Sequence, residues 1–414
     1  MDDHDAVGAT GSNPRKVVGD LACQHDTYRT SLNTKVYECT KSKKGKGDEA
    51  FEIQLYDTIL FPEGGGQPWD HGILKTPNNS IKITKILRRK LEAIHYSPKP
   101  IDKETDVSVE LYWPRRFDHA QQHSGQHLLS AVLDQYDIPT LSWTMGTDIV
   151  YVEVARLPDD LREVEDKCNE YIRQNLPITV KQTSERTENE LKDLPADYDA
   201  TAGVVRIVSI GGIDQNPCCG THVRSTSELN SLSILYTTTV RGSNSRIHFV
   251  VGGRVQKQLK EIYDRNRGMG ASLSCGLPEI PDKIAGLQAQ MKDLMKKEKL
   301  LRAESVAMET HKLEESLKSG GKAFMHRDVG DTDFLNQILS TITTPLPGLC
   351  MLVAGGKDGG PIIIAGPEEE VKRLSEEVKS KIPAIKGGGR SGKWQGKSSS
   401  YTVADLEMLH GFVQ

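Results

Sequence analysis

The stretch His123-Ser124-Gly125-Gln126-His127-Leu128-Leu129-Ser130-Ala131-Val132-Leu133 determines how the centre of this 414-residue chain is built. Its apolar second half is typical of a helix, which puts His123 and His127 four residues apart on one helical face. Two imidazoles at this spacing can converge on one metal ion. Ser124 stands where the metalloprotease helix motif carries its glutamate general base, so the motif does not indicate a peptidase.

A second pair of potential metal ligands lies in Cys218-Cys219-Gly220-Thr221-His222. It follows the apolar segment 204–208 and the turn-rich segment 211–217, which predicts a loop at the end of a strand. A histidine pair alone often marks only a helix surface, and adjacent cysteines are often small buried apolar residues. Two pairs at matched spacing favour a mixed His/Cys site instead, and this is chemistry that zinc prefers. We therefore predict one zinc ion per chain. Its predicted ligands are His123, His127, Cys218 and His222.

The two motifs together resemble the editing domain shared by alanyl- and threonyl-tRNA synthetases. Upstream, Gly64-Gly65-Gly66-Gln67 is similar to the glycine-rich motif of the alanyl branch, and residues 241–247 resemble the segment that closes the domain. Together with Lys386-Gly387-Gly388-Gly389-Arg390, the resemblance covers nearly the whole chain. The sequence is identified as a member of the long freestanding alanyl-tRNA editing proteins, the AlaX-like family that eukaryotes carry as an alanyl-tRNA synthetase domain-containing protein.

This resemblance implies a trans-editing hydrolase that deacylates mischarged tRNA(Ala), chiefly Ser-tRNA(Ala) and also Gly-tRNA(Ala), by zinc-dependent hydrolysis of the aminoacyl ester. His123, His127, Cys218 and His222 would act through the ion. A shell of four protein ligands is the pattern of a structural zinc, whereas catalysis needs an open position, so activation of water and orientation of the substrate both remain open. Register with the family's Cys-x-x-x-His pattern assigns the ligand role to Cys218 and not to Cys219.

Two further groups of residues are expected to bind the substrate. Gly64, Gly65, Gly66 and Gln67 would approach the terminal adenosine, although a tight turn in the β-rich part explains the same residues. The acid-free segment 386–397 would contact the tRNA body, with an ordinary basic loop as its alternative. Lys386, Arg390 and Lys393 are predicted to contact phosphates. The indole of Trp394 is predicted to stack on a base.

Two other classes of protein stay open: a different zinc hydrolase, and a non-catalytic zinc-stabilised module for binding tRNA or a protein. Only 122 residues precede His123, too few for a class II adenylation domain beside the glycine motif, so no aminoacylation is expected. The formal charge of −4 is unlike a typical nucleic-acid-binding domain, but it does not exclude basic patches. Seven dispersed cysteines and the lack of a long apolar segment predict a cytoplasmic protein without a membrane partner.

The predicted fold is α+β. Residues 1–109 should form a β-rich barrel-like domain with the glycine motif, with 1–19 disordered, followed by a zinc-binding editing domain at 110–262. Residues 263–320 read as a helical connector, because apolar residues recur at three- and four-residue steps. Self-association through this connector and a simple linking role both fit. Alternating strand and helix patterns predict a small C-terminal α/β tRNA-binding module at 321–414.

Overall fold

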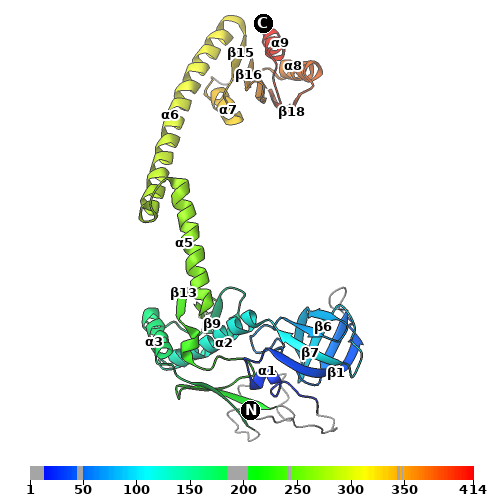
Figure 1. The fold of residues 1–414 in the computed structure, drawn as a ribbon. Helices are drawn as coiled ribbons and strands as arrows, with labels where there is room; N and C mark the ends of the chain where they lie inside the picture. The colour runs from blue at the N-terminus through cyan, green and yellow to red at the C-terminus, as the bar shows by residue number, and fades with distance from the viewer. Residues whose placement is uncertain are drawn as a thin grey trace. The chain divides into compact units, whose positions relative to one another are not determined.

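A computed structural model shows an α+β protein (Figure 1) and describes residues 14–43, 50–183, 204–240, 242, 244–342, 346 and 348–414. The chain forms two compact units, Met1–Asn266 and Arg267–Gln414. The finer division at 109, 262 and 320 stays a prediction. Two predictions fall outside the described residues: the disorder of residues 1–13 and the role of Arg241 in the segment that closes the editing domain. Disorder is wrong for residues 14–19, because Val18 is buried against Leu21 and Phe61.

The first unit begins with a nearly closed antiparallel sheet of seven strands, as the β-rich pattern predicts. The strand order is β4-β3-β7-β1-β2-β6-β5, and β4 lies against β6, which brings the two ends of the sheet together. Alternating apolar side chains such as Val107 and Val109 fill its interior. A short helix, α1 (Ala22–His25), precedes the strands β1 (Ser31–Lys41), β2 (Phe51–Leu55), β3 (Gly72–Lys75), β4 (Ser80–Ile83), β5 (Lys85–Arg89), β6 (Glu92–Ser97) and β7 (Asp106–Leu111).

The second half of this unit is built on helix α2 (Trp113–Asp134), which contains both predicted histidine ligands. Its apolar face packs on the antiparallel sheet β13-β14-β9-β8. Gly125 permits this close packing, because a Cβ there would lie 2.4 Å from Val251 Cγ2. The remaining elements are β8 (Thr140–Met145), β9 (Val150–Val154), α3 (Leu161–Arg173), β10 (Ile178–Thr183), β11 (Val205–Ile210), β12 (Asp214–Pro217), η2 (Thr226–Leu229), β13 (Leu232–Thr239) and β14 (Ser245–Val251).

A buried ion pair anchors the start of α2 to the β-rich sheet. The side chains of Arg116 and Asp70 are both fully buried and paired with each other. Arg116 also donates to the carbonyl oxygens of Thr27 (2.9 Å) and Ile59 (2.5 Å), which satisfies a charge that would be costly to bury alone. The helix with the histidines is thereby held in a defined position against the residues that precede it.

Helix α5 (Gly253–Leu273) crosses from the first unit into the second, where η3 (Leu277–Glu279) and the 41-residue helix α6 (Ile280–Gly320) follow. The second unit is completed by a five-stranded sheet of order β15-β16-β17-β19-β18 with helices α7, α8 and α9. Gly321 adopts a left-handed conformation (φ 69°) and ends α6. The bounds are β15 (Lys322–Arg327), α7 (Thr332–Thr341), β16 (Leu349–Ala354), β17 (Gly360–Ala365), α8 (Glu368–Lys381), β18 (Ile385–Arg390), β19 (Lys393–Ser398) and α9 (Val403–Gly411).

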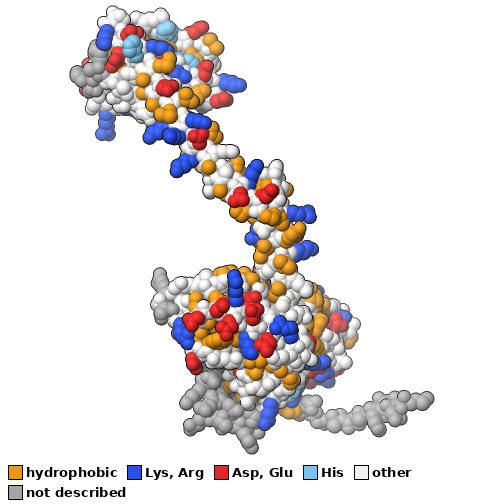
Figure 2. Space-filling view, turned by 90° about the vertical axis from the view of Figure 1, so that its left-hand side faces the viewer, with side chains coloured by type: hydrophobic (Ala, Val, Ile, Leu, Met, Phe, Trp, Pro, Cys, Tyr) orange, Lys and Arg blue, Asp and Glu red, His pale blue; other side chains and the backbone are white. Residues whose placement is uncertain are grey.

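The apolar residues predicted to line the connector are exposed over most of α6. Figure 2 shows hydrophobic side chains among charged ones on the surface of the α5–α6 segment. The C-terminal part of α6 is different, because Val306, Leu313 and Leu317 are buried in a core shared with α7 and β16. Six apolar residues of the predicted connector are each at least 40% exposed: Ile284, Leu287, Met291, Leu294, Leu301 and Met308.

The seven cysteines, all among the described residues, form no disulfide bonds. Within the described parts of the chain, every helix is too short or too polar to cross a bilayer.

Candidate metal centre

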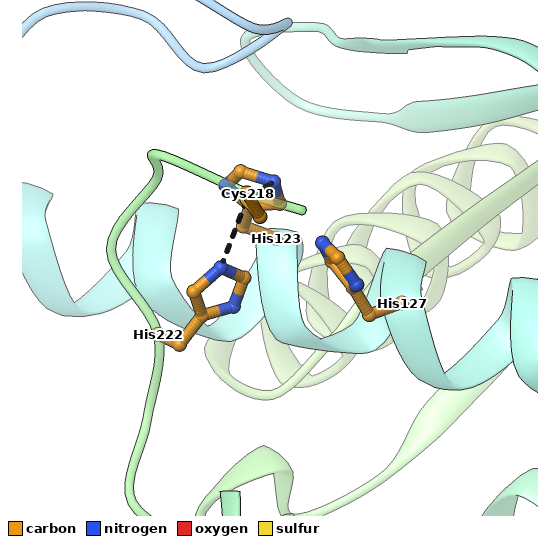
Figure 3. A group of neighbouring side chains, drawn as sticks. All are labelled: His123, His127, Cys218 and His222. Atoms are coloured by element: carbon orange, nitrogen blue, oxygen red, sulfur yellow. Dashed lines mark hydrogen bonds between the residues drawn. The ribbon is translucent and has the colours of Figure 1, made fainter. Parts of the chain in front are cut away.

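The structure brings the four predicted ligands together in one buried cluster. His123 and His127 lie one turn apart on α2, and Cys218 and His222 lie on the loop that follows β12 (Figure 3). Their ligand atoms lie within 4.8 Å of one another. Cys218 Sγ is 3.4 Å from His123 Nε2 and 3.3 Å from His222 Nε2. A helix face and a strand-end loop therefore contribute two candidate ligands each.

Each ligand also has a hydrogen-bond partner outside the cluster. Nδ1 of His123 lies 2.9 Å from Gln67 Oε1, Nδ1 of His127 lies 3.3 Å from Asp214 Oδ2, and Nδ1 of His222 lies 3.1 Å from Ser124 Oγ. Cys218 Sγ accepts from the backbone N–H of Gly220 at 3.3 Å. The three rings thus use Nδ1 for outward contacts, which leaves Nε2 as the ligand atom. Such outer contacts fix the tautomer and orientation of metal-binding histidines.

The electrostatics of the cluster favour a thiolate. Burial alone would raise the pKa of the Cys218 thiol, but the adjacent His123 and His222 hold that pKa well below its usual value. Burial lowers the pKa of His222 to about 3, which keeps this ring neutral. Burial also acts to lower the pKa of His127, but hydrogen bonds to Asp214 and Cys218 raise it to about 10, so metal binding would displace a proton from this ring. A thiolate and neutral imidazoles are the forms that bind metal.

A buried arginine shapes the loop that carries Cys218 and His222. Arg206, on β11 and only 2% exposed, donates to the carbonyl oxygens of Cys218 (2.9 Å), Gly220 (2.9 Å) and Gln24 (2.7 Å). Gly220 is required for close approach, because a Cβ there would lie 2.1 Å from His123 Cε1. Sequence reasoning did not assign a role to Arg206, Gly220 or Asp214. The charged Arg206 within an otherwise apolar strand was the signal that could have revealed one of them.

The glycine motif forms a tight turn beside this cluster. Gly64 and Gln67 exchange two backbone hydrogen bonds of 3.1 Å, and Gly65 and Gly66 have positive φ values of 58° and 82°. The interpretation as a turn is therefore correct. Gln67 is fully buried with its side chain on His123 and Thr221, so the contact predicted between Gln67 and the terminal adenosine does not fit its position. A contact with substrate stays a prediction for Gly64, Gly65 and Gly66.

A cavity of about 620 Å³ opens beside the cluster. His123, His127 and Cys218 line it, together with Gly64 and Gly65. Its polar wall contains a short chain of hydrogen bonds: Gln126 Nε2 donates to Ser130 Oγ at 2.9 Å, and Ser130 Oγ lies 2.7 Å from Thr140 Oγ1. The cavity could hold a small polar group next to the ligands.

The predicted tRNA-binding tail is a hairpin and not a flexible loop, because β18 and β19 pair along their whole length. Lys386 and Arg390 lie exposed on the edge strand β18. Lys393 is half-buried and donates to Asn336 Oδ1 at 2.7 Å. The stacking role predicted for Trp394 is wrong, because its indole is 4% exposed and packs in the core of the second unit.

The donor chemistry indicates which ions the cluster could hold. Three imidazoles and one thiol suit zinc and similar transition metals, whereas calcium and magnesium prefer oxygen ligands. Four donors are also the number that zinc usually takes from a protein at a structural site. The residues present therefore fit the predicted ion.

Fold and site define an α+β protein with a buried His/Cys centre beside a cavity, and comparison with known proteins identifies the family. The threonyl and alanyl tRNA synthetase second additional domain matches residues 205–248. The mouse alanyl-tRNA editing protein Aarsd1 is 34% identical over 393 residues, covering 91% of this chain and 93% of the mouse protein. The zebrafish Aarsd1 is 32% identical over 405 residues, covering 94% and 96%. Alanyl-tRNA editing protein AlaX-L of Pyrococcus horikoshii is 31% identical over 243 residues, covering 57% and 59%.

The chain belongs to the family of alanyl-tRNA editing proteins, which confirms the resemblance seen in its motifs.

Proposed function

We propose that this protein is a trans-editing deacylase that hydrolyses mischarged tRNA(Ala), chiefly Ser-tRNA(Ala) and also Gly-tRNA(Ala), with one zinc ion held by His123, His127, Cys218 and His222. The observation that carries the proposal is the convergence of these four side chains, within 4.8 Å, at the wall of a cavity of about 620 Å³ in a chain of the editing family. The protein would act in the cytoplasm.

The substrate preference follows from the limits of alanine recognition. A pocket made for a methyl group rejects a side chain that adds a hydroxyl by only about 10²-fold, and it discriminates weakly against loss of the methyl. A second, hydrolytic site removes the products of such errors. Serine and glycine are the amino acids that differ from alanine in these two ways.

The cavity residues divide the work between holding the substrate and favouring hydrolysis. When bound, zinc would supply a Lewis acid that polarises the ester carbonyl or lowers the pKa of a water. The hydroxyls of Ser130 and Thr140, with the Gln126 amide, offer hydrogen bonds to a seryl hydroxyl. The turn at Gly64–Gly65 leaves room for the substrate beside the ligands, because neither glycine has a side chain.

One observation favours a second candidate. The protein offers four candidate ligands at one point, and four protein ligands are the pattern of a structural zinc. The alternative is therefore a non-catalytic, zinc-stabilised module that binds tRNA or a protein. It predicts tRNA binding without turnover.

Incubation of the purified protein with Ser-, Gly- and Ala-tRNA(Ala) separates these candidates. We expect release of serine, slower release of glycine and no release of alanine. His123→Ala should abolish release of serine together with zinc binding. Tight binding of tRNA without release of any amino acid would support the non-catalytic module. Hydrolysis of unrelated esters as fast as that of Ser-tRNA(Ala) would support a different hydrolase.

A further inference from the structure

The Gln67 side chain makes three hydrogen bonds that link the glycine turn to the candidate metal centre. Its Oε1 lies 2.9 Å from His123 Nδ1 and accepts from the backbone N–H of Thr221 at 3.0 Å, and its Nε2 donates to Thr221 Oγ1 at 2.8 Å. The side chain is fully buried. It therefore connects His123 on α2 with the loop that contains two further candidate ligands, Cys218 and His222.

The hydrogen-bond network fixes the direction of each bond. A backbone N–H can only donate, so the amide atom facing Thr221 N must be the oxygen of Gln67. The same oxygen faces His123 Nδ1, which must then carry the proton. In the neutral form of this ring Nε2 carries no proton, and this is the atom that faces Cys218 Sγ at 3.4 Å. Gln67 thus selects the one neutral tautomer that can bind a metal through Nε2.

Packing leaves His123 and Gln67 little freedom to rearrange. A Cβ at Gly220 would lie 2.1 Å from His123 Cε1 and 2.9 Å from Gln67 Oε1, so the loop already packs directly on both side chains. Gln24 Nε2 also donates to the carbonyl oxygen of Cys219 at 2.7 Å. Residues that precede α2 therefore hold the ligand loop at two points.

We propose that Gln67 is a positioning residue of the metal centre: it holds His123 in the Nδ1–H tautomer and holds the Cys218–His222 loop against it, so that affinity for the ion depends on the glycine turn. This inference rests on the proposed metal-binding role of the four ligands. Loss of such an outer partner usually weakens metal affinity by about 10- to 100-fold.

The test compares substitutions that differ only in hydrogen bonding. Gln67→Met keeps most of the side-chain volume and removes every side-chain hydrogen bond. Gln67→Glu keeps acceptors for His123 and for Thr221, since the threonine hydroxyl can donate to the new oxygen. Gln122→Met is the matched control, because Gln122 is equally buried but, within the described residues, makes no hydrogen bond to a candidate ligand. Its main partners are the N–H and C=O of Val251 (3.0 and 2.8 Å).

Zinc affinity is measured by competition with a chelator, and the ligand field is measured from the visible absorption of the Co²⁺-loaded protein. We expect Gln67→Met to weaken zinc binding by about 10- to 100-fold and to alter the Co²⁺ bands. Gln67→Glu should restore both, and Gln122→Met should leave both unchanged although it destabilises the fold. Equal affinity and equal spectra in wild type and Gln67→Met would overturn the proposal.

A measurement on the unaltered protein covers the case in which Gln67→Met does not fold. Imidazole ¹H–¹⁵N spectra of the zinc-loaded wild type should show His123 protonated at Nδ1 and slow to exchange. Protonation at Nε2 would overturn the proposal. Failure of the proposed editing function looks different: the zinc affinities would still depend on Gln67, while no amino acid would be released from Ser-tRNA(Ala).

Discussion

Cys218 and Cys219 are neighbours in sequence, but only one of them reaches the cluster. Cys218 Sγ lies 3.4 and 3.3 Å from two imidazole nitrogens, whereas the carbonyl of Cys219 accepts from Gln24. We therefore expect Cys218→Ala to lose most of its zinc and to unfold at a lower temperature, because metal binding contributes to folding. Cys219→Ala should retain about one zinc per chain. Elemental analysis and thermal unfolding check both, and metal loss confined to Cys219→Ala would reverse the assignment.

A buried histidine far from the ligands should make stability depend on pH. Burial lowers the pKa of His95 to about 4, and the ring lies between Ile53 O (3.2 Å) and Thr58 Oγ1 (3.1 Å). Below its unfolded pKa of about 6.5 the unfolded chain takes up a proton here that the folded chain does not. Stability is therefore present above about pH 6.5 and is lost as pH falls towards 4, by on the order of 3 kcal/mol.

The check is denaturant unfolding of wild type and His95→Gln between pH 4 and pH 7. The variant should show a smaller loss of stability across this window. His311→Gln serves as the control, because His311 is exposed and should leave the slope unchanged. Parallel curves for wild type and His95→Gln would show that another group governs the acid response.

At the residue scale, the sequence predicts the ligands because each pair lies on one local element. His123 and His127 need only a helix, and Cys218 and His222 need only a loop. The role of Gln67 could not be predicted in this way, since its partner Thr221 is far along the chain and only the tertiary fold brings them together. The burial of Trp394 has a different cause: buried and exposed residues alternate along β19, but the glycines of this segment hide the strand pattern in the sequence.

At the scale of elements, apolar periodicity predicts helices but not their partners. Apolar residues at three- and four-residue steps occur in both halves of α6, interrupted at Glu298 and Ser305. Yet Leu287 and Leu294 are exposed, and Leu313 and Leu317 are buried. Only the sheet and α7 that pack on the C-terminal part distinguish them. Self-association through the exposed part stays a prediction. β12 shows the reverse case, since the polar segment Asp214–Pro217 is a strand only because β11 pairs with it.

At the scale of the whole molecule, the ligands and the exposed cations belong to different units. The four candidate ligands and the cavity beside them lie within residues 14–266. Lys386 and Arg390 lie in the unit that begins at Arg267. Truncation near Gly320 would separate the buried part of α6 from the core into which it packs. Truncation after Asn266, at the boundary of the two units, is therefore the better test. The fragment 1–266 should bind zinc and deacylate a short acceptor-stem mimic.

The full chain provides a sharper test of the second unit. If Lys386 and Arg390 each contact a phosphate, changing both to Gln should weaken binding of full-length tRNA and lower the slope of log affinity against log salt by roughly 1.4–1.8, at about 0.7–0.9 per contact. Deacylation of the acceptor-stem mimic should not change. Lys372→Gln with Lys379→Gln, two exposed lysines on α8, controls for net charge. Equal salt slopes in both double variants would mean that β18 does not contact the tRNA backbone, and that charge on this unit contributes only through its total.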